Sequence, residues 1–95
     1  MSNAIEVGLG TVGRLRILRE LISHQGQALT KYQLAKLTHL KNLSLRRDLE
    51  VLIRLGWVEE LPYRPKKYRV NLEREEVRHL AEFFQRVDYW AKRRI

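Results

Sequence analysis

The stretch that decides the fold is Leu29–Val58, LTKYQLAKLTHLKNLSLRRDLEVLIRLGWV. Thr30 is a suitable N-cap, so a short helix is predicted over about Lys31–Leu37, and the sequence THLK then breaks it. In the next segment apolar residues recur three and four positions apart, which predicts a second helix over about Asn42–Leu55 with one buried face. Gly56 ends this helix, and the chain turns towards a strand.

The exposed side of the second helix carries short polar and cationic groups near its N-terminus, where a DNA-reading helix needs them. The candidates for contact with bases are Asn42, Ser44, Arg46 and Arg47. Asparagine suits adenine N6/N7 and arginine suits guanine O6/N7, each in bidentate fashion. The sequence leaves open which arginine reads a base and which holds a phosphate. Leu43 falls on the same exposed face.

The positive charge of the chain is concentrated around this motif. The net charge is +8, and residues 14–69 hold 13 lysines and arginines against 5 acidic residues, whereas residues 70–95 hold 6 against 5. A localised excess of this kind favours a polyanionic partner, of which nucleic acid is the commonest. Contacts with the DNA backbone are expected from basic residues in and after the motif: Lys31, Lys36, Lys41, Arg64, Lys66 and Lys67.

The segment before the motif predicts one further helix over about Val12–His24, capped by Thr11 or Gly13. Its apolar residues form a stripe that is expected to face the core. Three arginines fall on the other side and are expected to point to solvent: Arg14, Arg16 and Arg19.

The first ten residues show little periodicity, so residues 1–10 are predicted to be a flexible lead-in. Gly8–Gly13 matches G-x-G-x-x-G, the fingerprint of dinucleotide-binding sites. That site also needs an acidic residue about 20 positions later and a crossover to a parallel strand. The sequence provides neither, so the glycines are interpreted as part of the lead-in to the first helix.

Two strands are predicted over Trp57–Leu61 and Lys67–Leu72, with a proline-containing turn between them. They form a β-hairpin with a basic tip in which Tyr63 and Tyr68 are interleaved with cations. Such a tip suits contact with phosphates or a minor groove. The alternative is a solvated hairpin whose charges only protect an edge.

Residues 73–95 predict one long helix, acidic in its first turn and basic in its last, as the helix dipole favours. A heptad-like apolar seam runs along it. We expect this seam to contact a second copy of the chain through Val77, Leu80, Phe84, Val87, Trp90 and Ala91. The alternative is a helix that folds back on its own domain.

Several classes of protein are disfavoured by composition. The chain has no cysteine, hence no disulfide framework and no thiolate metal site. Nothing resembles a signal peptide, and no apolar run approaches the roughly 18–20 residues of a membrane span, so a cytoplasmic protein is expected. The three histidines lack metal-ligand spacing. We expect no enzyme activity, no cofactor, no metal and no dedicated small-molecule pocket.

The order of helix, short strand, helix, helix and hairpin resembles the winged helix-turn-helix fold. The resemblance covers Val12–Leu72 and is carried by Leu29-Thr30, Leu34-Ala35, the spacing of three leucines in the second helix of the motif, and the LGWVE sequence at residues 55–59. It implies a mainly α domain with a small β-hairpin over residues 11–72, followed by a C-terminal dimerisation helix over residues 73–95. The chain is broadly similar to small dimeric regulators of archaea and bacteria, including the MarR-, ArsR- and PadR-like groups.

This resemblance implies a homodimeric transcriptional regulator that binds double-stranded DNA sequence-specifically. The second helix of the motif would enter the major groove, and the basic hairpin, or wing, would lie on the backbone or in the minor groove. Two alternatives remain. A winged helix can serve as a protein-interaction module, which the exposed Leu43 favours. It can also bind RNA or DNA with little sequence preference, which the basic, tyrosine-bearing hairpin favours.

Overall fold

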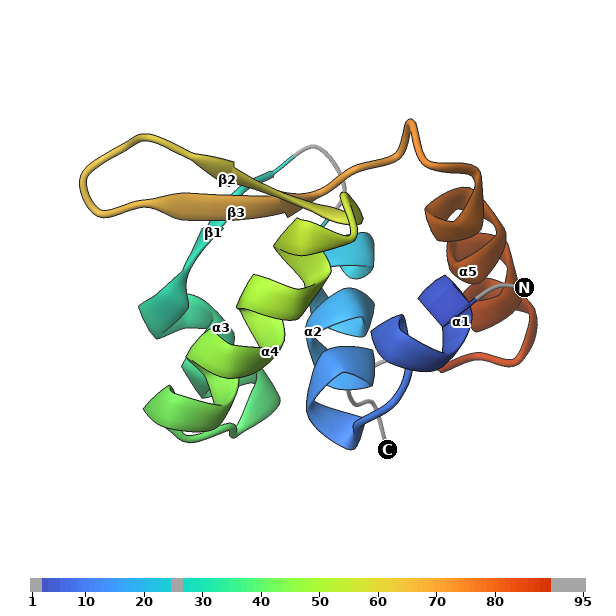
Figure 1. The fold of residues 1–95 in the computed structure, drawn as a ribbon, viewed down its shortest axis with the longest axis horizontal. Helices are drawn as coiled ribbons and strands as arrows, with labels where there is room; N and C mark the ends of the chain where they lie inside the picture. Colours follow the sequence, from blue (N-terminus) through green and yellow to red (C-terminus); the bar gives the residue numbers. More distant parts are fainter. Residues whose placement is uncertain (1–2, 25–26, 90–95) are drawn as a thin grey trace.

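The computed structural model describes residues 3–24 and 27–89 (Figure 1). The elements are, in chain order, α1 (Asn3–Gly8), α2 (Val12–Ser23), β1 (Leu29–Thr30), α3 (Lys31–Thr38), α4 (Asn42–Arg54), β2 (Val58–Leu61), β3 (Lys67–Val70) and α5 (Glu75–Arg86). The protein is mainly helical with a small antiparallel sheet of strand order β1-β3-β2, so the coarse fold class predicted from the sequence is confirmed.

The core is built around α2, which contributes the fully buried Ile17, Leu18 and Leu21. In Figure 1, α3 and α4 lie on one side of this helix and α1 and α5 on the other, with the sheet along the top edge. The rest of the buried cluster comes from the other elements: Leu29, Leu34, Leu45, Leu49, Leu52, Trp57, Val58, Tyr68, Val70, Val77 and Phe84.

The helices of the central motif begin and end where their local chemistry requires. Thr30 Oγ1 accepts a hydrogen bond from the Gln33 N–H (3.1 Å), and the Gln33 side chain accepts one from the Thr30 N–H (2.9 Å), which together form a capping box at the start of α3. After α4, Gly56 adopts a left-handed φ of 81°, and the Trp57 N–H donates to the Leu52 carbonyl (3.0 Å). This closure leads α4 directly into β2.

The predicted lead-in contains a short helix, because residues 3–8 form α1 and Gly8 at its end lies against the Trp57 ring. A Cβ added at Gly8 would lie 2.2 Å from the Trp57 ring, and one added at Gly13 would lie 2.2 Å from Asp48 Oδ2. These glycines therefore allow close approach of the backbone to side chains that are distant in sequence. Their role is packing, which the interpretation as a lead-in missed.

The predicted C-terminal helix is also too long, because α5 ends at Arg86. Asp88 adopts a left-handed φ of 57°, and the Tyr89 N–H donates to the Phe84 carbonyl (2.8 Å), as in a Schellman closure. The Tyr89 ring then packs edge-on against Phe84, with ring centroids 5.1 Å apart. Residues 90–95, over which the helix was predicted to continue, lie outside the described residues.

The sequence predicted that the three arginines of α2 point to solvent, but each of them contacts another part of the chain. Arg14 Nε is 3.0 Å from Asp48 Oδ1 of α4, and Arg16 Nη1 donates to the Thr38 carbonyl at the end of α3 (3.2 Å). Arg19 pairs with Glu20 and lies 5.0 Å from the centre of the Tyr89 ring. These contacts hold α2 against α4, α3 and the segment that follows α5. The polar side of this central helix is therefore also covered by other parts of the chain.

Candidate nucleic-acid interface

The outward face of α4 carries the residues that the sequence singled out. Asn42, Ser44, Arg46 and Arg47 are all exposed, whereas Leu45, Asp48, Leu49 and Leu52 on the opposite face are buried. The charge of the buried Asp48 is compensated by Arg14. The four candidate side chains are therefore presented to solvent by a helix whose other face is fixed in the core.

Arg46 and Arg47 form no hydrogen bond or ion pair with any other part of the chain that the structure describes. Many other arginines do, including Arg14, Arg16 and Arg19 of α2. In the described ranges, the lysines and arginines that make no hydrogen bond, ion pair or ring contact lie between residues 31 and 64, apart from Arg86. They are Lys31, Lys41, Arg46, Arg47, Arg54 and Arg64.

A groove of about 170 Å³ separates α4 from the β2–β3 hairpin and brings three candidates together: Lys31, Arg46 and Lys66. Lys66 Nζ lies 3.0 Å from Glu60 Oε2, and the hydrogen bond and the charge of that carboxylate raise the pKa of Lys66 above its ordinary value. Burial raises the pKa of Tyr68, which also lines the groove. Lys36, Lys41 and Arg64 are not among the residues that line it.

The hairpin is less basic in its effective charge than its sequence suggested. Glu59 lies directly opposite Arg69 across the ladder, and Arg69 Nε is 2.8 Å from Glu59 Oε1. Lys66 is similarly paired with Glu60. The cations of the tip with no carboxylate partner in the described chain are Arg64, which is exposed, and Lys67, whose Nζ lies 5.5 Å from the centre of the Tyr63 ring. The strand register places these opposite charges side by side.

The start of α4 is open to solvent. Lys41 occupies the N-cap position and its side chain makes no capping hydrogen bond. The first amide groups of a helix need partners from outside the helix, and an anion is a suitable one. Lys36, in the last turn of α3, is also exposed and lies 5.4 Å from the centre of the Tyr32 ring.

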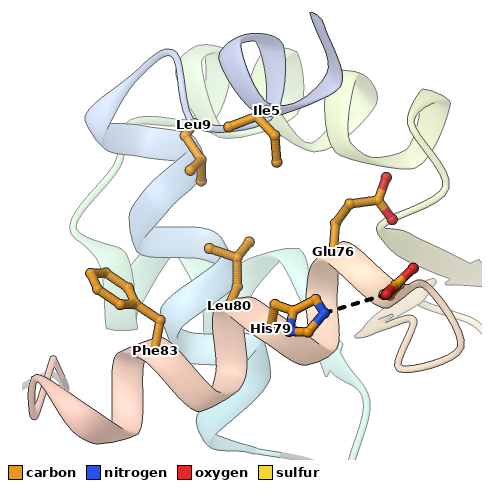
Figure 2. A pocket seen from close by; sticks show the side chains of 7 residues that line it. Ile5, Leu9, Glu76, His79, Leu80 and Phe83 are labelled. Carbon is orange, nitrogen blue, oxygen red and sulfur yellow. Dashed lines mark hydrogen bonds and ion pairs between the residues drawn. The ribbon is translucent and has the colours of Figure 1, made fainter. Parts of the chain in front are cut away.

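A second surface feature is an apolar cleft of about 450 Å³ between α1 and α5. Figure 2 shows Ile5 and Leu9 on one wall and Leu80 and Phe83 on the other, with Glu76 and His79 towards one end. The dashed line in Figure 2 joins His79 Nε2 to Glu75 Oε2, 3.4 Å apart. The sequence did not reveal this cleft because α1 was not predicted.

The surface proposed for dimerisation is changed by the way α5 packs. Val77 and Phe84 are 0% and 2% exposed within the chain's own core, so they are not on a surface that a second copy can reach. Leu80 is partly buried and lines the cleft, and Val87 is exposed. Trp90 and Ala91 lie outside the described residues. The exposed Phe83, which the seam left out, shares this surface.

No family model, curated protein or solved structure matches the chain. In the parts covered by the structure, no helix combines the length and apolar character that crossing a bilayer requires. Nor do residues 3–24 and 27–89 hold a group of three or more histidine, aspartate or glutamate side chains arranged to bind a metal ion.

Proposed function

We propose that the chain is a winged helix-turn-helix protein that binds double-stranded DNA and regulates transcription. In this proposal α3 and α4 form the helix-turn-helix and the β2–β3 hairpin is the wing. One observation carries it: Arg46 and Arg47 are exposed and have no described partner on a helix whose remaining face is anchored in the core. Exposed arginines without acidic partners are suited to guanine edges and phosphates.

The N-terminal half of α4 would enter the major groove, which is wide enough for a helix. Asn42, Ser44, Arg46 and Arg47 are the candidates for contact with bases there. Positioning contacts with phosphates would come from α3, from the uncapped start of α4 and from the wing: Lys31, Lys36, Lys41, Arg64, Lys66 and Lys67. Because Lys66 is paired with Glu60, we expect Arg64 and Lys67 to contribute more than Lys66.

The proposal places the protein in the cytoplasm and includes a homodimer. Two copies related by a two-fold axis would present two reading helices to half-sites about one helical turn apart. With Val77 and Phe84 buried, the surface that remains for self-association consists of the partly buried Leu80 and the exposed Phe83 of α5, with the exposed Val87 at its C-cap.

A binding assay against three ligands tests the proposal. The purified chain would be titrated with random duplex DNA, single-stranded DNA and RNA at salt concentrations between about 50 and 200 mM, the range over which phosphate contacts weaken strongly. A preference for duplex, sharpened after selection of a binding site, supports the proposal. Equal binding of all three ligands favours the sequence-nonspecific alternative. Absence of binding favours the protein-interaction module, for which the exposed Leu43 (61% exposed) is the supporting observation.

A further inference from the structure

The face of α4 that points directly away from the core carries an apolar residue. A helix turns about 100° per residue, so the direction opposite the buried Leu45–Leu52 face is occupied by Leu43, Arg47 and Glu50, and by Arg54 at the C-terminal end of the helix. Asn42 and Ser44 lie on the flanks of this strip. Leu43 is 61% exposed and, with Arg46, Arg47 and Glu50, lines a hollow of about 210 Å³.

Arg46 and Arg47 have different surroundings. Arg46 also lines the groove towards the wing, where Lys31 and Lys66 lie, whereas Arg47 does not. A cluster of cations beside a wing is suited to a phosphate strand. Arg47 belongs instead to the strip that would face the floor of the major groove.

Glu50 belongs to the same strip as Arg47. It is exposed, forms no ion pair with the described residues, and lines both the hollow that it shares with Arg46 and Arg47 and the groove towards the wing. A carboxylate repels phosphates, and in the major groove it can only accept hydrogen bonds from amino groups such as cytosine N4. A strip that combines an apolar side chain, an arginine and a carboxylate therefore matches base edges better than a backbone.

Resting on the proposed function, we infer that the strip Leu43–Arg47–Glu50 is the base-reading surface and that Leu43 packs against the 5-methyl group of a thymine. Arg47 reads a guanine near that thymine, and Arg46 holds a phosphate. The methyl group of thymine is the apolar group that the major groove exposes, and aliphatic side chains contact it directly. Leu43, which is exposed to water in the free protein, would then be in apolar contact with this methyl group.

The test uses the full chain and the duplex selected from a random library. Each thymine of the selected site is replaced by uracil, which lacks only the 5-methyl group. Loss of one buried methyl is expected to weaken binding about fourfold per half-site, from about 0.8 kcal/mol per buried carbon group. Leu43→Ala should bind the thymine and uracil duplexes equally. Val12→Ala, at a residue of α2 that is 62% exposed, is the matched control and should keep the wild-type ratio of affinities for the two duplexes.

The two arginines are separated in the same assay. Arg47→Ala should lose about tenfold or more of the discrimination at one guanine, the scale of a bidentate base contact. Arg46→Ala should keep the base preference and lower the slope of log affinity against log salt by about 1. The inference is overturned if no thymine-to-uracil change affects the wild type, if Leu43→Ala keeps the difference, or if the two arginines exchange these effects. If no duplex is bound, or all are bound equally, the proposed function fails together with the inference.

Discussion

The contact between Gly13 and Asp48 provides the sharpest test of how the reading helix is held. Gly13→Ala would place a methyl group 2.2 Å from Asp48 Oδ2, whereas real Cβ contacts are essentially never under 3.0 Å. The carboxylate must therefore retreat by roughly 1 Å, which disrupts the 3.0 Å pair between Arg14 and Asp48. That pair fastens α4 to α2, and its side chains are only 17% and 10% exposed.

The expected cost follows from these numbers. Breaking a buried ion pair costs about 3–5 kcal/mol, and the partial exposure of this one places it near the lower limit. The helix preference of alanine over glycine returns up to about 1 kcal/mol. We therefore expect Gly13→Ala to lower the free energy of unfolding by about 2–3 kcal/mol, which at about 4–8 °C per kcal/mol lowers Tm by roughly 10–20 °C.

The assay is a double-mutant cycle followed by circular dichroism in thermal and urea unfolding. In an Asp48→Ala background the obstructing carboxylate is absent, and the next contact, with Leu40 Cδ1, is an ordinary 3.4 Å. The same Gly13→Ala change should then be neutral or stabilising by up to about 1 kcal/mol. An equal loss of stability in both backgrounds, or no loss in the wild type, would refute the reasoning.

Three further predictions concern the surface and the charges. Phe83→Glu should leave Tm nearly unchanged but convert a dimer to a monomer in light scattering, whereas Phe84→Ala should destabilise the fold by about 3–5 kcal/mol, as for a buried aromatic residue. The pKa of Glu76 is lowered, first by a hydrogen bond from its own backbone N–H and then by the Arg74 guanidinium. The ionised carboxylate therefore stabilises the fold above pH 4.5, the ordinary pKa of the group, and this stabilisation is lost as the pH falls through the lowered pKa. Glu76→Gln should make the free energy of unfolding depend less on pH on the acid side. With about five phosphate contacts per chain, and so about ten per dimer, duplex affinity should fall by about 10⁵-fold between about 50 and 200 mM salt, and a salt-independent affinity in anisotropy titrations would contradict the assignment of the lysines.

The central motif could be predicted from the sequence because its signals are local. Thr30 caps α3 by accepting a hydrogen bond from the backbone N–H of Gln33, three residues later. Gly56 ends α4 with a left-handed φ that glycine adopts easily. The period of the apolar residues in α4 identified its buried face. Each of these features depends on residues only a few positions apart.

The features that were missed depend on distant residues or on unusual local choices. α1 is held where Gly8 meets Trp57, a contact between segments far apart in the sequence. Arg14 was expected in solvent because its partner, Asp48, is 34 residues away. The end of α5 was missed because Asp88, and not a glycine, takes the left-handed position.

The same limits apply to the candidate interface. The exposed face of α4 follows from helical periodicity alone. The pairing of Arg69 with Glu59 depends on the register of the hairpin, which the sequence did not define. The burial of Val77 and Phe84 depends on α5 packing against its own domain.

The proposed DNA binding depends most directly on the exposed charges of Arg46 and Arg47. The deciding measurement is the affinity for the selected duplex of Arg46→Ala/Arg47→Ala compared with Arg78→Ala/Arg86→Ala, which removes the same charge from α5. The account predicts that the α4 pair abolishes sequence-specific binding while the mass in light scattering is unchanged, and that the α5 pair binds almost as the wild type does. Equal affinities for the two double variants would contradict it.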